Sequence, residues 1–365
     1  MGRLYPELKI DLEKIRHNTR ETVKRCEERG IDVCAVIKGC SGLVKIAEAV
    51  SRSGVKQLAT SRIQQAVKCR EAGITTPFLL LRVPALSEIP DVIQYFNYSL
   101  QSELLTVQEM EKACAAAGVT HKVIMMMDLG DIREGYWDKE AFVRDCVYIH
   151  NRLEHIRLAG IGTNLGCYGA VKPTEAKMAE LVSLAEEIRE QTGTPLEIIS
   201  GGASNAFPLV QDGTMPEGIN HLRIGDNILL SRGLQTKLKV PDTGYLDMTA
   251  FVVRAEIVEV REKPSYPQGE LSLNAYGKLP QFEDRGIRKR ALAALGDADA
   301  GDVTELLPVD EKIRIVGGSS DYIILDVTET ETDLHIGDVV EFYPEYVNML
   351  HLTMSPDVRI TWVNE

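Results

Sequence analysis

The sequence has no apolar run of membrane-spanning length, and its opening stretch, MGRLYPELKID, holds no apolar signal core. A spanning helix needs about 20 consecutive apolar residues, and a secretory signal needs an apolar stretch of about 7–15. The sequence also has no long basic tract. Its 41 lysines and arginines stand against 54 aspartates and glutamates, which gives a net charge of -13. This balance argues against nucleic acid or an anionic membrane as a partner. We therefore expect a cytoplasmic protein.

Cysteine and histidine are too few and too scattered to build a covalent or metal framework. The seven cysteines include no CxxC pair, and none follows Cys167. This pattern excludes a disulfide scaffold and a zinc knuckle, and the seven histidines show no metal-ligand spacing. We expect most cysteines to be small buried side chains, with Cys40 and Cys167 as candidates to line a site. No metal site is predicted.

Short apolar segments alternate with amphipathic helical stretches eight times within residues 1–235. This alternation predicts a parallel sheet, and eight repeats are typical of a (β/α)8 TIM barrel. The predicted strands are Asp32–Ile37, Lys56–Ala59, Pro77–Leu81, Tyr98–Leu100, Lys122–Asp128, Leu158–Thr163, Leu196–Ser200 and His221–Ile224. The first helical stretch, Asp11 to Arg29, precedes them.

Residues 236–365 have a different texture, with alternating β-branched segments separated by turn residues. This texture predicts a second, mainly antiparallel β domain, with which the first ten or so residues are candidates to pair. Its predicted strands are Met248–Val260, Lys312–Val316, Tyr322–Val327 and Val339–Tyr343, with Gln281–Arg290 and Gly296–Asp302 as excursions.

Barrels of this kind place their chemistry where strands end. Lys38 follows the first predicted strand, and a lysine at that mouth, preceded by apolar residues, is placed to form a Schiff base. The seventh strand ends in Ser200-Gly201-Gly202-Ala203-Ser204-Asn205, and Gly225 follows the eighth. Bare backbone N–H groups and hydroxyls before a helix predict a phosphate cradle.

A phosphate cradle that faces a lysine suggests pyridoxal 5′-phosphate as the cofactor. Arg223 lies on the eighth strand and is the candidate partner of the ring nitrogen. Because arginine stays protonated, it would donate a hydrogen bond there and disfavour protonation of the ring. A ring of this kind is a weaker electron sink, which disfavours transamination and still permits removal of the α-proton.

The segments AVIKG, DLGDIREG, GIGTN, ISGGASN and HLRIG resemble, in this order, the fold-type III pyridoxal-phosphate enzymes, whose best-known member is alanine racemase. DRGIRKRAL, IRIVGGSSDYIILDVT and IGDVVEF resemble the β domain of that racemase. GIGTNLGCYG, PEGINHLRIG and FEDRGIRKRA are most similar to the alanine/ornithine racemase family. The resemblance covers nearly the whole chain.

The resemblance implies a role for each residue at the strand ends. It makes Lys38 the Schiff-base lysine and one catalytic base, and it places Arg133 near the cofactor's phenolic oxygen and the substrate carboxylate. It puts Asn164 where alanine racemases carry a histidine beside the ring. It further implies a homodimer in which each barrel mouth is completed by the partner's β domain. The implied phosphate ligands are Ser200, Gly202, Ser204 and Gly225, with Arg223 on the ring nitrogen.

Two departures from alanine racemase concern the handling of phosphate and carboxylate. GCSG, after Lys38, lacks the tyrosine that those enzymes use as a phosphate ligand, and Met126 stands near the place of their carbamylated lysine. Their second base is a tyrosine of the partner's β domain. Either Asn274 or Tyr276 aligns with it, and only Tyr276 can carry a proton in this way, with Tyr168 and Cys167 as rivals.

The resulting prediction is an isomerase that interconverts L- and D-amino acids, with ornithine or a related basic amino acid as substrate. A side-chain ammonium needs an acidic partner, for which Asp131, Glu134 and Asp321 are candidates. One alternative is a lyase or decarboxylase of the same fold, although the β domain lacks cysteine and the C-terminal region lacks a Cys-Glu-Ser/Thr signature. The other is a non-catalytic cofactor-binding protein, a type that ends after the barrel.

Overall fold

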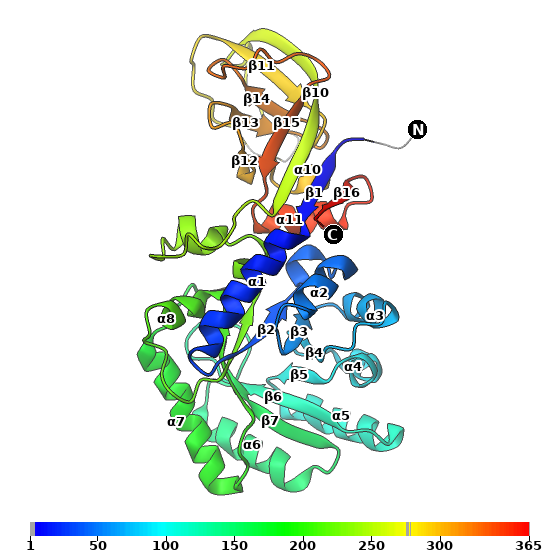
Figure 1. Ribbon diagram of the computed structural model, residues 1–365, viewed down its shortest axis with the longest axis vertical. Helices are drawn as coiled ribbons and strands as arrows, with labels where there is room; N and C mark the ends of the chain where they lie inside the picture. The colour runs from blue at the N-terminus through cyan, green and yellow to red at the C-terminus, as the bar shows by residue number, and fades with distance from the viewer. Residues whose placement is uncertain (1–3, 275–276, 278, 365) are drawn as a thin grey trace. The chain divides into compact units, whose positions relative to one another are not determined.

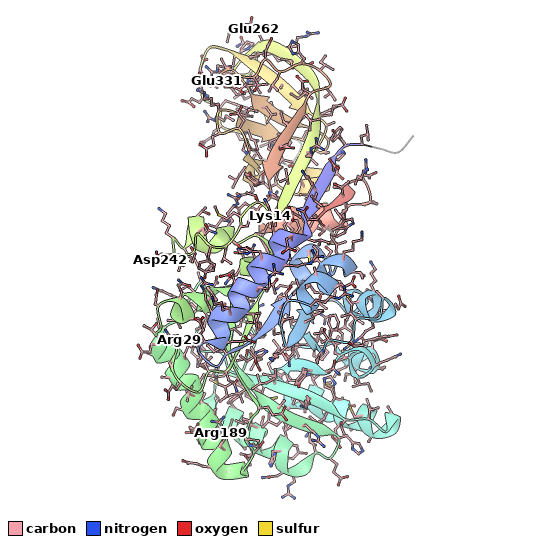
Figure 2. The ribbon with its side chains drawn as sticks, viewed as in Figure 1. Lys14, Arg29, Arg189, Asp242, Glu262 and Glu331 are labelled. Atoms are coloured by element: carbon pink, nitrogen blue, oxygen red, sulfur yellow. The ribbon has the colours of Figure 1, made fainter. Side chains whose placement is uncertain are left out.

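A computed structural model describes residues 4–274, 277 and 279–364 of the chain. The chain forms two compact units, Leu12–Met248 and Met1–Asp11 with Thr249–Glu365. None of the helices among the described residues is both long enough and apolar enough to cross a membrane. Charged side chains cover the outside of the barrel unit, where Figure 2 places Arg29 and Arg189 at the periphery.

The unit Leu12–Met248 is a closed barrel of eight parallel strands that pair in chain order, with β9 returning to β2. Helices lie outside the strands (Figure 1), so both faces of each strand are covered. This is why β2 carries four consecutive buried residues, Val33 to Val36. The barrel confirms the predicted fold class. The strands are β2 Asp32–Val36, β3 Gln57–Thr60, β4 Phe78–Leu80, β5 Tyr98–Gln101, β6 His121–Met126, β7 Ile156–Gly162, β8 Ile198–Ala203 and β9 His221–Ile224.

Helices α2 to α8 connect successive strands, as a parallel barrel requires, while α1 precedes the first barrel strand and α9 follows the last. They are α1 Leu12–Glu27, α2 Val44–Ser51, α3 Ile63–Glu71, α4 Ile89–Tyr95, α5 Leu104–Ala117, α6 Lys139–Arg152, α7 Glu175–Thr192, α8 Phe207–Gln211 and α9 Asp226–Leu229. Thr174 caps α7, because its side chain accepts a hydrogen bond from the backbone of Lys177, whereas α3 and α5 begin without a side-chain cap.

The barrel interior is a packed core. One cluster of buried side chains draws on six of its strands and comprises Cys34, Val36, Ala59, Leu79, Leu100, Ile124, Met126 and Ile198. Met126, at the place where alanine racemases are carbamylated, belongs to this cluster and is fully buried. The core fixes the strand ends, because close-packed side chains leave little room for the strands to shift.

The other unit is a mainly antiparallel sheet ordered β12-β15-β10-β11-β14-β13. The long strand β10 pairs through its first half with β1 and β15 and through its second half with β11. The only parallel pair among these described strands joins β1 to β16. The elements are β1 Glu7–Asp11, β10 Phe251–Pro264, β11 Ile287–Ala293, α10 Asp297–Ala300, β12 Leu307–Pro308, β13 Arg314–Gly318, β14 Ile323–Asp326, β15 Val339–Tyr343, α11 Tyr346–Met354 and β16 Arg359–Val363.

Strand β11 corrects one sequence prediction, because its first four residues, 287–290, fall within the predicted charged excursion Gln281–Arg290. The strand pairs with both β10 and β14. Its charges are balanced across the sheet: Arg288 Nε lies 2.8 Å from Asp326 Oδ2, and Lys289 Nζ lies 2.7 Å from Asp333 Oδ1. A run of basic residues therefore hid a strand whose ionic partners lie far along the chain.

The two units meet in the sequence at Met248, later than the predicted boundary at residue 235. The intervening segment belongs with the barrel because it is tied to α1. Asn18 exchanges two hydrogen bonds of 2.8 Å with the backbone of Asp247, and the Arg25 guanidinium lies 3.2 Å from the centre of the Tyr245 ring. These contacts lie far apart in sequence, so the change in composition after residue 235 did not mark them.

Gly160 in β7 offers a test of the barrel's packing. A Cβ atom there would lie 1.8 Å from the Ile198 carbonyl oxygen on β8. We expect Gly160→Ala to lower the free energy of unfolding by about 3 kcal/mol or more, because backbone cannot move aside inside a closed barrel. Gly244→Ala is the control, since nothing lies within 4 Å of its added carbon. Urea denaturation of both variants checks this, and equal stabilities would contradict it.

Candidate functional site

The rim formed by the carboxyl ends of the barrel strands gathers the residues that the sequence singled out. Lys38 begins the single turn after β2, and Arg133 lies in the loop between β6 and α6. Asn164 follows β7, and Arg223 lies within β9. Because all eight strands run in parallel, residues at or just beyond their carboxyl ends share one mouth.

Lys38 is a half-buried amine among charged neighbours. Burial lowers the pKa of its ammonium group below the ordinary value, and the positive charges of Arg133 and Arg223 lower it further, against the opposing influence of Cys167 and Glu134. A lowered pKa raises the fraction of neutral amine at a given pH. Lys38 is therefore suited to act as a nucleophile toward a carbonyl and as a base.

Arg223 is a buried cation, with 3% of its surface exposed. One terminal nitrogen donates to the Ser200 hydroxyl, and the other donates to the Thr163 carbonyl at 2.8 Å and to Asn164 Oδ1 at 3.4 Å. These acceptors come from the ends of β7 and from β8. They hold the guanidinium inside the barrel below the level of Lys38's turn, since β9 Arg223 pairs with β2 Cys34.

The Ser200 hydroxyl accepts a hydrogen bond from this buried arginine. Its side chain is fully buried, and besides accepting from Arg223 its hydroxyl lies 2.8 Å from His221 Nδ1. Burial lowers the pKa of His221 to about 3, and the nearby charge of Arg223 lowers it as well. His221 is therefore neutral and internal to the barrel.

After β8, where the sequence predicts a phosphate cradle, the side chain of Ser204 contacts the loop that follows β9. The Ser204 hydroxyl accepts hydrogen bonds of 3.2 Å from the backbone N–H groups of Gly225 and Asp226. Gly202 has φ +114°, a conformation that only glycine adopts easily. The helix that follows, α8, has five residues, so its dipole adds little, and the groups that could donate to an anion are the Ser204 O–H and the two N–H groups that here donate to its oxygen. The N–H of Asp226 had no signal in the sequence.

Arg133 is paired with its neighbour Glu134. The guanidinium nitrogens Nη2 and Nε lie 2.7 Å from the two carboxylate oxygens. Burial raises the pKa of the Glu134 carboxyl, while Arg133, and the more distant Arg223 and Lys38, act in the opposite direction. The site thus contains a carboxylate beside two arginines and Lys38, and residue type alone does not distinguish it from Asp131 or Asp321.

Asp131 has a structural task that removes it from the candidates for a substrate ammonium. Its buried carboxylate accepts four backbone N–H bonds of 2.9–3.2 Å, and together these hold the loop after β7. Burial raises the pKa of this carboxyl, but the four donors outweigh that effect, so the net pKa is lowered. The donors are the backbone groups of Gly166, Cys167, Tyr168 and Val171.

The loop held by Asp131 carries the two rival candidates for the second base. Cys167 is exposed, and its Sγ lies 3.1 Å from Asn164 Nδ2, which donates to it. Tyr168 is 70% exposed. Cys40, by contrast, is fully buried and donates to the Ile37 carbonyl, so it does not line the mouth. Tyr276 lies outside the described residues.

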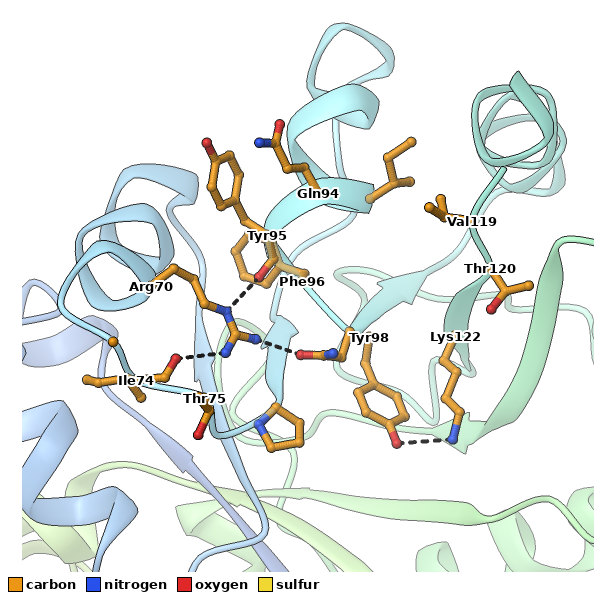
Figure 3. Close-up of a pocket in the computed structure, with 14 residues that line it drawn as sticks. Arg70, Ile74, Thr75, Gln94, Tyr95, Phe96, Tyr98, Val119, Thr120 and Lys122 are labelled. Carbon is orange, nitrogen blue, oxygen red and sulfur yellow. Dashed lines mark hydrogen bonds between the residues drawn. The ribbon is translucent and has the colours of Figure 1, made fainter. Parts of the chain in front are cut away.

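The opposite end of the barrel has a pocket of about 760 Å³ beside the amino ends of β4, β5 and β6 (Figure 3). Its charged groups are used within the protein. Arg70 donates to the carbonyls of Ile74 and Tyr95, and Lys122 donates to Tyr98 and pairs with Glu197. The charged side chains of this pocket therefore hold neighbouring loops together. The pocket contains none of the candidate site residues of the carboxyl-end mouth. Across the described part of the chain, no group of three or more potential metal ligands comes together.

Comparison with known proteins gives one family for the barrel. Residues 10–230 match the alanine racemase N-terminal domain family. The ornithine racemase of Acetoanaerobium sticklandii is 38% identical over 353 residues, which cover 95% of this chain and 96% of that protein. The lysine racemase of Thermotoga maritima is 38% identical over 358 residues and covers 98% of both chains.

The fold recurs in solved structures of lower identity. Alanine racemase from Streptomyces lavendulae superposes with a TM-score of 0.75 at 18% identity, covering 98% of this chain and 97% of that one. The Clostridium difficile alanine racemase in complex with cycloserine gives 0.75 at 20% identity, covering 100% and 98%.

Removing the charge of Asp131 tests how far the mouth depends on this anchor. Asp131→Asn keeps the shape of the side chain but points an amide group at backbone donors. We therefore expect it to lower the free energy of unfolding by about 2–4 kcal/mol. Hydrogen exchange should quicken at the amides of Gly166, Cys167, Tyr168 and Val171. Asp242→Asn, an exposed substitution, is the control, and unchanged protection of these amides would contradict the assignment.

The same anchor predicts a direction with pH. Because the folded pKa of Asp131 is lowered, its stabilising contribution is present above the ordinary value of 3.8 and is lost as the pH falls through the lower folded value. The difference in stability between wild type and Asp131→Asn should therefore shrink in acid.

Proposed function

The chain belongs to the alanine racemase family and is an amino-acid racemase, and we propose that it uses pyridoxal 5′-phosphate to interconvert L- and D-ornithine or a related basic amino acid. The observation that carries the cofactor proposal is Lys38, a half-buried amine of lowered pKa in one mouth with the Ser204 hydroxyl and the N–H groups of Gly225 and Asp226. A reactive amine and an anion-binding donor set are what this cofactor requires.

The residues present fit the cofactor group by group. Lys38 would hold its aldehyde carbon, and Gly202, Ser204 and Gly225 would hold its phosphate. Arg223 would face its ring nitrogen, with Asn164 beside the ring and Arg133 near the phenolic oxygen. Ser200 was grouped with the phosphate ligands from the sequence, and we instead assign it to Arg223, because its hydroxyl is buried against that side chain.

Racemisation requires that a proton leave one face of the α-carbon and return on the other. When bound, pyridoxal 5′-phosphate supplies a conjugated ring that accommodates the electron pair left on that carbon. Lys38 Nζ, whose lowered pKa favours the neutral amine, takes or returns the proton on one face. Arg223, as a permanent cation, disfavours protonation of the ring and so limits side reactions.

For the opposite face we propose Tyr276, contributed by the β domain of a second copy in a homodimer. This assignment rests on the resemblance of the segment around it to the racemases' β domain. Cys167 and Tyr168 lie in the barrel unit itself and are the alternatives that a Tyr276→Phe variant separates.

All seven cysteines are free thiols, which agrees with a reducing compartment such as the cytoplasm.

The substrate class is proposed from two observations. Relatives named ornithine racemase and lysine racemase match the chain over nearly its whole length. The mouth also contains Glu134, which is the remaining candidate of the barrel unit for a side-chain ammonium once Asp131 is committed to the loop, while Asp321 belongs to the β-domain unit. A carboxylate has about four acceptor positions, and Arg133 uses two of those of Glu134.

Proton exchange in heavy water tests the reaction and the substrate together. We expect the cofactor-loaded protein to convert L-ornithine or L-lysine into the D-enantiomer with deuterium on the α-carbon. Lys38→Ala should lower the rate by about 10²–10⁴-fold, because one proton carrier is lost. Lys56→Ala, at the amino end of β3, is the control. Borohydride reduction followed by peptide mapping should place the cofactor on Lys38, and a protein that binds cofactor without exchanging any substrate would contradict the racemase substrate proposal.

Glu134→Gln tests the ammonium site separately. This variant keeps the shape and removes the charge, so we expect KM for ornithine to rise about 10-fold or more. KM for norvaline, which has the same five-carbon chain and lacks the side-chain amine, should change little. Glu197→Gln, which alters a carboxylate at the other end of the barrel, is the control. An equal loss on both substrates would mean that Glu134 acts through Arg133 instead.

A further inference from the structure

Behind Arg223 lies a line of buried polar side chains that the reaction as described does not use. It runs from Arg223 to the Ser200 hydroxyl, on to His221 Nδ1 at 2.8 Å, and from His221 Nε2 to Gln57 Oε1 at 3.2 Å. The exposed fractions of Ser200, His221 and Gln57 are 0%, 3% and 6%. The line crosses β8, β9 and β3, so it spans the interior of the barrel.

The hydrogen atoms along this line have one consistent arrangement. Gln57 Oε1 can only accept, so His221 carries its proton on Nε2 and offers a lone pair at Nδ1. The Ser200 hydroxyl then donates to Nδ1 and keeps its oxygen lone pairs for Arg223. With the proton on Nδ1 instead, Nε2 and Gln57 Oε1 would face each other as two acceptors, and the Ser200 proton would lose His221 as its acceptor.

This arrangement requires a neutral imidazole. A protonated His221 would donate from Nδ1, and the Ser200 hydroxyl would lose the acceptor that fixes its orientation. Burial lowers the pKa of His221 to about 3, with Arg223 contributing in the same direction, so the neutral form is the one present near neutral pH. The strands support this geometry, because His221 and Arg223 are two residues apart on β9 and so point to the same side.

We propose that Ser200, His221 and Gln57 are positioning residues that hold the Arg223 guanidinium in the orientation that it presents to the cofactor's ring nitrogen. The inference rests on the proposed function, since it assigns Arg223 to that ring. Its consequence is that the electronic state of the bound cofactor depends on a histidine and a glutamine that do not touch it.

The chain contains a matched cluster that separates positioning from stability. His121, on β6, is also buried, and burial lowers its pKa to about 4. Its Nε2 lies 3.0 Å from the Ser99 hydroxyl, which accepts from Gln101 at 2.9 Å. This second histidine–serine–glutamine cluster ends at Met110, whose Sδ lies 3.0 Å from Gln101 Nε2. Its hydrogen bonds join it to the core rather than to Arg223.

The test compares cofactor-loaded His221→Leu and Ser200→Ala with His121→Leu. We expect the first two to shift the absorption maximum of the bound cofactor and to weaken its binding about 10-fold, because a hydrogen bond to a charged group is lost. His121→Leu should lower the urea midpoint comparably while leaving the spectrum and the affinity as in wild type. His221→Asn, whose Oδ1 can replace Nδ1 as the acceptor, should restore the spectrum.

Two results would overturn the proposal. One is an unchanged spectrum and cofactor affinity in Ser200→Ala and His221→Leu. The other is an equal spectral shift in His121→Leu, which would show that loss of any buried histidine is sufficient. The absorption spectrum of the cofactor can be measured without turnover. Spectral shifts in a protein that racemises no substrate would therefore support the positioning role and contradict the substrate proposal. A wild-type protein that binds no cofactor would overturn both.

Discussion

A guanidinium inside a closed barrel has to be given acceptors, and much of the site follows from that requirement. Transfer of an unpaired charge into a low-dielectric interior costs several kcal/mol even after relaxation. Arg223 meets the requirement with a carbonyl from the end of β7, an amide oxygen next to it and a hydroxyl from β8. The three acceptors come from neighbouring strands, so the arginine also holds the ends of those strands in register with one another.

The buried cation has electrostatic consequences across the mouth. It contributes to the lowered pKa of Lys38 and to that of His221. Glu134 is the counterweight, a partly buried carboxylate paired with Arg133. A site with three cations and one carboxylate suits a ligand that brings a phosphate, a carboxylate and an ammonium group, as a phosphorylated cofactor and a basic amino acid do together.

The loops at the mouth are held by hydrogen bonds from backbone N–H groups to two buried aspartates. Asp128 accepts from Gly130, Ile132 and Arg133, and Asp131 accepts from the loop after β7. DLGDIREG is therefore a structural motif as much as a chemical one, since two of its acidic residues shape loops and one lies in the site. The proposed positioning residues behind Arg223 act in a similar way deeper in the barrel. Ser200, His221 and Gln57 would orient a functional group without contacting a ligand.

Periodicity and strand-end residues predicted a large share of this protein. All eight barrel strands were placed within a few residues of their observed bounds, because a strand buried on both faces is a short apolar run bounded by helical periodicity. Strand β11 was not found, since its basic residues conceal the alternation until Asp326 and Asp333 are brought beside them. The unit boundary at Met248 was likewise set by long-range contacts with α1.

The sequence by itself determined the fold class, the lysine and arginines at the strand ends and the resemblance to racemases, since these depend on local patterns and residue types. Only the tertiary structure decided what each polar group is bonded to. It placed Ser200 on Arg223, committed Asp131 to a loop, paired Glu134 with Arg133 and joined Gln57 to His221 across 164 positions of sequence. The physical reason is that a buried polar group is defined by its partners, and barrel closure supplies those partners from strands that are distant in the chain.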